Sequence, residues 1–112
     1  MNPSGAEAEA LAAALLESHG CVVRARNFRC RMGEIDLVVD DAGTLVFVEV
    51  RKRAHSRFGG AGESITAAKQ ARLVAAARAY LSRLATEPPC RFDAVLVDGR
   101  QQARWIRDAF GT

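Results

Sequence analysis

Alternating apolar and polar positions between Gly33 and Arg53 predict a β-hairpin near the middle of the chain. Two runs rich in β-branched residues flank a turn of sequence DDAG. Because side chains alternate across a strand, Glu34 and Asp36 are expected on one face of the first run. By the same rule, Glu49 and Arg51 share a face of the second run. The hairpin thus places acids of both strands among apolar neighbours.

Further helices and strands are predicted on both sides of this hairpin. In chain order they are a helix over 6–19 stopped by Gly20, a short strand over 21–26, a basic connection over 27–33, a second helix capped by Ser64 or Thr66 and running to about Leu84, a strand over 91–99 and an edge strand over 104–107. The order α-β-β-β-α-β-β predicts one α/β domain with a mixed sheet flanked by helices.

The composition indicates a folded protein, with 112 residues of which 49% are hydrophobic. No apolar run approaches the roughly 20 residues that a membrane span needs, so no membrane association is expected. Acidic residues interrupt the N-terminal stretch where a signal peptide would be apolar, so a cytoplasmic location is expected. The three cysteines lack the spacing of a zinc site or a disulfide framework, and free thiols are expected.

Arginine dominates the basic residues, with 14 Arg against 2 Lys and a net charge of +3. Its guanidinium group binds phosphate oxygens in pairs, which favours a nucleic-acid partner, although a GC-rich coding sequence gives the same bias. For the arginines of the connection and the histidine of the loop after the hairpin, simple solvent exposure is the alternative. The candidate nucleic-acid contacts are Arg29, Arg31, Lys52, Arg53, His55, Arg57 and Lys69.

The acids of the hairpin are the candidate catalytic residues. Carboxylates are rarely buried unless they are paired or bind a metal. Asp36 and Glu49 lie on partner strands and can converge on one Mg²⁺, which prefers hard oxygen ligands. Arg51 would lie beside that ion, and the set suits hydrolysis of a phosphodiester. Glu34 is either a further site residue or a cap at the start of the strand.

Asp36 followed by Glu49-Val50-Arg51 resembles the D…(D/E)-x-K signature of the PD-(D/E)xK nucleases, with the spacing of the archaeal Holliday-junction resolvases. Nearly the whole chain resembles the YraN-like family of small bacterial proteins, uncharacterised protein family 0102, which are predicted endonucleases. The recurrent features are Glu9-x-x-Ala12-x-x-x-Leu16-x-x-x-Gly20, Asn27-Phe28-Arg29, Gly33-Glu34-Ile35-Asp36-Leu37, the run from Phe47 to Arg53, Phe58-Gly59, Lys69, Ala76-x-x-x-Tyr80-Leu81, Arg91-Phe92-Asp93 and Ala109-Phe110.

This resemblance implies a restriction-endonuclease-like fold of the tRNA-endonuclease and resolvase type, and an Mg²⁺- or Mn²⁺-dependent endonuclease of structured or branched DNA. It implies that Asp36, Glu49 and the backbone carbonyl of Val50 bind the metal. Glu9 becomes a candidate catalytic acid reaching in from the first helix, whereas its position alone suggests a favourable interaction with the helix dipole. A homodimer would suit a resolvase, because a branched duplex is cut at two positions that are related by a two-fold axis.

One position departs from the superfamily, because Arg51 stands where the signature has lysine. Arginine stays protonated and cannot act as a base, but it can orient water or stabilise charge on phosphate. Lys52 should point to the opposite face, and Lys69 of the second helix could substitute. The alternatives to a nuclease are a nucleic-acid-binding module that has lost cleavage, and a structural subunit whose acids pair with arginines.

Overall fold

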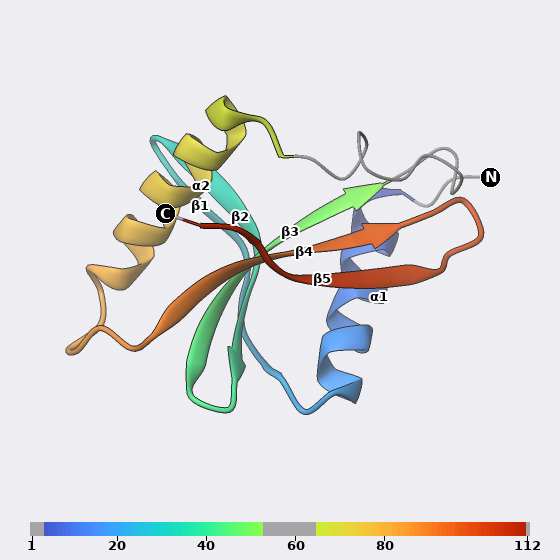
Figure 1. Ribbon diagram of the computed structural model, residues 1–112, viewed down its shortest axis with the longest axis horizontal. Helices are drawn as coiled ribbons and strands as arrows, with labels where there is room; N and C mark the ends of the chain where they lie inside the picture. Colours follow the sequence, from blue (N-terminus) through green and yellow to red (C-terminus); the bar gives the residue numbers. More distant parts are fainter. Residues whose placement is uncertain (1–3, 53–64, 112) are drawn as a thin grey trace.

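The computed structural model describes residues 4–52 and 65–111, which form a five-stranded sheet with a helix on each face (Figure 1). The elements are α1 (Gly5–Ser18), β1 (Val22–Cys30), β2 (Gly33–Asp41), β3 (Thr44–Lys52), α2 (Ala67–Leu81), β4 (Cys90–Val97) and β5 (Ala103–Phe110). The strand order is β1-β2-β3-β4-β5; the β3–β4 pair is parallel and the other neighbours are antiparallel. This mixed open sheet confirms the predicted element order and is consistent with a restriction-endonuclease-like fold.

Short-range hydrogen bonds explain where both helices begin. The Ser4 hydroxyl accepts a hydrogen bond from the Glu7 N–H at 3.1 Å, and the Glu7 carboxylate accepts one from the Ser4 N–H at 2.9 Å. At α2, the Thr66 hydroxyl accepts from the Lys69 N–H at 3.2 Å. Gly20 follows α1 and has a φ of 88°, a left-handed conformation that glycine adopts easily, so the predicted end of the helix at this glycine is confirmed. These residues define the first turns of α1 and α2 and the end of α1.

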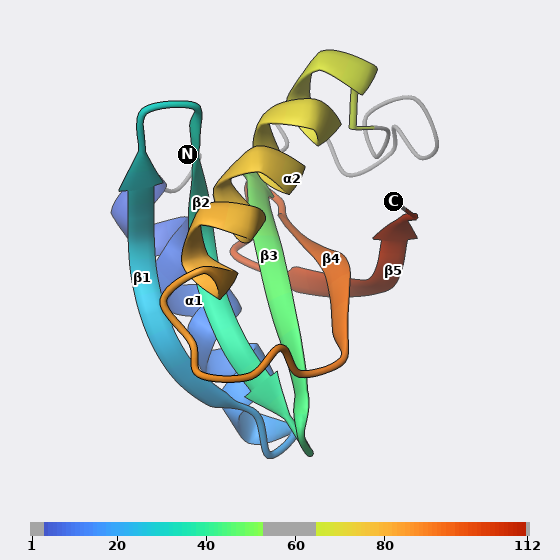
Figure 2. The same ribbon diagram turned by 90° about the vertical axis from the view of Figure 1, so that its left-hand side faces the viewer.

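Each face of the sheet carries its own apolar core, and Figure 2 shows α2 in front of the sheet and α1 behind it. The strands β2, β3 and β4 contribute to both cores, which explains their nearly continuous apolar sequences. The core under α1 includes Leu16, Leu37, Val39, Val46, Val48 and Val95. The core under α2 includes Phe28, Ile35, Val38, Phe47, Leu73 and Phe92.

The strand β1 is longer than the sequence predicts. Residues 27–33 are expected as a connection, yet β1 continues to Cys30 and only the next two residues form the turn to β2. Asn27 has a φ of 52°, a left-handed conformation that asparagine tolerates better than most residues. A turn-favouring residue therefore lies inside a strand, which is why the pattern indicates a loop there.

Side-chain alternation is interrupted at the residue of β2 that lies opposite Asn27. The register of the β1–β2 pair places Asp36 across from Asn27. Ile35 packs in the core under α2, whereas Leu37, two residues later, packs in the core under α1. Regular alternation would put both on one face. The alternation that predicts a shared face for Glu34 and Asp36 therefore does not hold at this point.

Two other boundaries also differ from the sequence-based expectation. The helix α2 ends at Leu81, three residues before its expected end, and β5 covers Ala103–Phe110 in place of 104–107. The edge position of β5 is confirmed. Within the two described ranges, no helix has the length and apolar character to cross a membrane.

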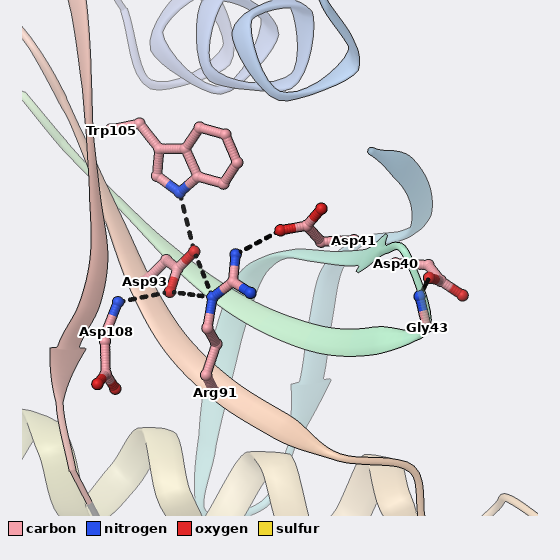
Figure 3. Close-up of polar contacts among 7 residues, drawn as sticks. All are labelled: Asp40, Asp41, Gly43, Arg91, Asp93, Trp105 and Asp108. Atoms are coloured by element: carbon pink, nitrogen blue, oxygen red, sulfur yellow. Dashed lines mark hydrogen bonds and ion pairs between the residues drawn. The ribbon is translucent and has the colours of Figure 1, made fainter. Parts of the chain in front are cut away.

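A buried carboxylate fastens β5 to the rest of the sheet (Figure 3). Asp93 of β4 is only 1% exposed. It accepts hydrogen bonds from Arg91 Nε at 3.0 Å, from Trp105 Nε1 at 2.8 Å and from the Asp108 N–H at 2.8 Å. Arg91 Nη2 also donates to Asp41 of β2 at 2.7 Å. These partners compensate the loss of hydration that burial of the charge would otherwise cost.

Candidate active site

The site begins where β2 and β3 separate. Their register runs from the Asp41–Thr44 pair next to the turn as far as the Leu37–Val48 pair. At the next step, the Val50 N–H donates a hydrogen bond of 2.7 Å to Asp36 Oδ2. A side-chain carboxylate thus accepts a bond that a strand carbonyl would normally accept. This substitution holds Asp36 at the opening between the two strands.

Glu49 of β3 is the second acid at this opening. It is 7% exposed, and its Oε2 lies 3.1 Å from the Nζ atom of Lys69, on the first turn of α2. The apolar alternation of β3 places Glu49 on the face that α2 covers, which brings the two residues together. A buried carboxylate is tolerated here because an ammonium group pairs with it.

The pKa of Asp36 is raised to about 7. Burial is the largest cause, because it penalises the charged carboxylate. The neighbouring charge of Glu49, a hydrogen bond to Glu49 and the more distant charge of Glu9 raise the pKa further, while the Val50 N–H opposes the shift. Two carboxyl groups that lie this close cannot both be ionised without cost, and a proton or a cation between them would lower that cost.

Basic side chains gather beside Glu49 on the side of α2. A cavity of about 310 Å³ is lined by Glu49 and by the basic residues Arg51, Lys52, Lys69 and Arg72. A second cavity of about 500 Å³ lies at the β1–β2 turn. Lys69 and Arg72 line both cavities, so the two are neighbours across the N-terminal half of α2. We call this pair of cavities the basic groove.

A model of the uncharacterised protein family UPF0102 matches residues 8–97. The chain belongs to this family. A UPF0102 protein of Nitrosospira multiformis is 56% identical over 108 residues, covering 95% of this chain and 91% of the relative. One of Methylobacillus flagellatus is 52% identical over 112 residues, covering 98% of each chain. The family membership confirms the resemblance that the sequence motifs carry.

In this UPF0102 protein, the acids predicted from the sequence separate into two groups. Asp36 and Glu49 come together, and Glu9, half-buried on α1, is near enough for its charge to act on Asp36. Glu34 instead pairs with Arg29 Nε at 3.0 Å on the exposed end of β2. In the part of the chain that the structure describes, no three carboxylate, histidine or cysteine side chains form a metal-binding group.

The basic residues predicted to contact nucleic acid lie in different parts of the structure. Arg51 lines the same cavity as Glu49, and so does Lys52, which was expected to point to the opposite face. Lys69 reaches Glu49 directly, which agrees with the idea that a helix lysine compensates for the arginine of the motif. Arg29 and Arg31 lie at the β1–β2 turn, beside the larger cavity. The predicted contacts Arg53, His55 and Arg57 fall outside the described residues.

Arg72 is a groove residue that the sequence analysis did not single out. It is exposed on α2 and lines both cavities of the basic groove. The signal was present, because residues three apart on a helix share a face and Arg72 follows Lys69 at that spacing. The role of Arg72 becomes visible only once this face of α2 is known to lie next to Glu49 of β3.

The oxygen donors of the UPF0102 site fit a hard divalent cation. Asp36 and Glu49 supply carboxylate oxygens, and a cation bound between them would offset both causes of the raised pKa of Asp36, first its burial and then the charge of Glu49. Val50 adjoins both acids, since it follows Glu49 in the chain and its N–H binds Asp36. Its carbonyl remains a predicted ligand. Mg²⁺ keeps several waters, so two or three protein oxygens are enough for it.

Proposed function

We propose that this UPF0102 protein is a metal-dependent endonuclease that hydrolyses phosphodiester bonds in structured or branched DNA. The observation that carries the proposal is the pairing of Asp36 and Glu49 at the strand opening, beside a cavity lined by basic side chains. Phosphodiester hydrolysis needs a bound cation, an activated water and positive charge near the phosphate. The residues around this opening could supply all three.

In the proposed reaction, Asp36 and Glu49 hold Mg²⁺ or Mn²⁺, with the Val50 carbonyl as a further ligand. The bound ion supplies polarisation of the phosphoryl oxygen and a more acidic water. Lys69 fixes the orientation of Glu49 through their 3.1 Å ion pair and adds positive charge at the site. Arg51 lines the same cavity and, because it stays protonated, stabilises negative charge on the phosphate and leaves the role of base to another group.

The direct test is cleavage of a labelled four-way junction, a flap and a linear duplex in the presence of Mn²⁺ or EDTA. Wild-type protein is compared with Glu49→Gln, which keeps the size of the side chain but removes its charge. Glu17→Gln, at an exposed carboxylate of α1, is the matched control. We expect metal-dependent products that fall about 100-fold or more in Glu49→Gln, since electrostatic contributions of this kind have that size. The control should cleave as well as wild type.

Two outcomes would contradict the nuclease. Products that form in EDTA or persist in Glu49→Gln would show that another site or a contaminant cuts the DNA. DNA binding without products at any metal concentration would favour the non-catalytic binding module, and Arg51 in the lysine position would be the simplest cause of the lost cleavage.

A resolvase makes paired cuts, which a homodimer would explain. Sedimentation of the protein with and without the junction would test whether it forms a homodimer.

A further inference from the structure

The turn between β1 and β2 presents an apolar side chain in a strongly basic setting. Arg31 and Met32 form this turn, and Met32 is 59% exposed. Single exposed apolar residues are common on protein surfaces, and Val22 and Leu84 are also exposed. Met32 differs from these two because it lines the larger cavity of the basic groove.

The charges around Met32 suit a phosphate backbone. Arg29, Arg31, Lys69 and Arg72 line the same cavity. Glu34 is the acid among its lining residues, and it is paired with Arg29 at 3.0 Å. The net charge of the cavity is therefore positive. Since Lys69 and Arg72 also line the cavity at Glu49, positive charge extends from the turn to the carboxylate pair.

Close packing fixes the turn relative to α2. A Cβ atom on Gly33, the first residue of β2, would lie 2.7 Å from the Arg72 carbonyl oxygen. Only glycine allows this approach of the hairpin to the helix backbone. Along β2, Met32 is four residues from Asp36, which at about 3.3 Å per residue is about 13 Å. That span corresponds to about four steps of a DNA strand, at about 3.4 Å per nucleotide.

We propose that Met32 is a wedge that inserts at the branch point of DNA, while Arg31 and Arg72 bind the phosphates of the strand that leads to the site. Methionine is one of the apolar side chains that proteins insert between bases to unstack them, and its flexible thioether adapts to the gap. Stacking of base pairs is already interrupted at a branch point, which lowers the energy needed for insertion. The inference rests on the proposed function in taking DNA as the partner, and it deepens that function by assigning how branched DNA is selected.

The test measures binding in EDTA, so that it does not depend on cleavage. Fluorescence anisotropy is recorded with a four-way junction and with a linear duplex of the same sequence. We expect Met32→Ser to weaken junction binding about tenfold and duplex binding less than about twofold, which matches the loss of one base-stacking contact. Met32→Leu should retain the preference. Val22→Ser removes an apolar side chain that is 50% exposed and lies away from the lining of the basic groove, and it is the matched control.

A base analogue at the branch point provides a second readout. 2-Aminopurine fluorescence should rise when wild-type protein binds the junction, because the base loses its stacking, and should not rise with Met32→Ser. Arg31→Gln and Arg72→Gln should instead weaken binding to junction and duplex alike, and each should lower the slope of binding against salt by about one unit. In the presence of Mn²⁺, cuts within about four nucleotides of the branch are expected from the separation of about 13 Å between Met32 and Asp36.

Each contrary result has a distinct meaning. An unchanged junction preference in Met32→Ser, or an equal loss in Val22→Ser, would overturn the wedge even if metal-dependent products form. A Met32-dependent preference without any products would support the wedge and contradict the nuclease. Tighter binding to an RNA hairpin than to the DNA junction would overturn the choice of partner. Failure to bind any of these probes would overturn both.

Discussion

At the scale of single residues, Asp36 meets two opposing demands. The Val50 N–H stabilises its charged form, whereas burial and the neighbouring Glu49 favour its protonated form, and the result is a pKa near 7. A carboxyl group whose pKa is raised on folding stabilises the folded state at low pH. This contribution is complete below the pKa of the unfolded chain and is lost as the pH rises through the folded pKa.

The pH dependence of stability should therefore report Asp36 directly. In EDTA, the melting temperature is expected to fall between about pH 4 and pH 7, and Asp36→Asn should remove that part of the slope. At pH 8 the variant should melt at least about 4 °C above wild type, the shift that corresponds to about 1 kcal/mol in a domain of this size. Scanning calorimetry from pH 4 to pH 8 measures both effects.

Asp40 provides a control of opposite sign. A hydrogen bond from the Gly43 N–H and a second from Arg24 hold its pKa below the usual value. Its contribution to stability is present at neutral pH and is lost as the pH falls through its folded pKa.

Plots of melting temperature against pH that run parallel for wild type and Asp36→Asn from pH 4 to pH 8 would contradict the raised pKa of Asp36. So would failure of Mn²⁺ to stabilise wild type more than the variant at pH 8.

At the scale of elements, the β1–β2 hairpin is shaped by the interruption at Asn27 and Asp36. The presence of both strands of the central hairpin, and of two acids on them, could be predicted because alternation and the rarity of buried carboxylates are local rules. The interruption of side-chain alternation in β2 could not be predicted, because no pattern of residue types indicates that Asn27 adopts a positive φ inside a strand. The ion pair between Lys69 and Glu49 could be predicted once the first turn of α2 was known to lie next to β3.

Substitutions at Asn27 test whether this conformation is required. Asn27→Gly should leave stability nearly unchanged, because glycine adopts a positive φ without steric cost. Asn27→Val should destabilise the fold by about 1–2 kcal/mol, the cost of a left-handed conformation for a residue with a Cβ, and more for a β-branched one. Urea unfolding followed by circular dichroism measures the difference. Arg26→Val, at the neighbouring exposed strand position, should change stability by less than about 0.5 kcal/mol.

At the scale of the whole molecule, the sheet depends on contacts between residues far apart in sequence. Asp93 joins β4 to Trp105 and Asp108 of β5, and through Arg91 to Asp41 of β2 (Figure 3). Trp105 lies 12 residues from Asp93, and Asp41 lies 50 residues from Arg91. No local spacing indicates such partners, so the sequence shows an Asp in an apolar strand without showing what satisfies it.

Removal of this carboxylate should affect the entire domain. Asp93→Ala removes the acceptor of Arg91 Nε, Trp105 Nε1 and the Asp108 N–H, while Arg91 keeps its ion pair with Asp41, and we expect a loss of about 3 kcal/mol in the free energy of unfolding. Arg24→Ala breaks an exposed ion pair of 3.3 Å with Asp40 and should cost less than about 1 kcal/mol. Urea titration of both variants gives the comparison. Equal losses in the free energy of unfolding would show that the buried contacts of Asp93 stabilise the protein no more than the exposed Arg24–Asp40 pair does.

The hydrogen bond from the Val50 N–H to Asp36 has a consequence for spectroscopy. A backbone amide proton that binds a carboxylate resonates at a position set by the charge of that carboxylate. Because the pKa of Asp36 lies near 7, the Val50 resonance reads the protonation of the site from the backbone itself. The same resonance would also register any cation that replaces the proton, so one amide of the 15N-labelled protein gives the occupancy of the centre without a substrate.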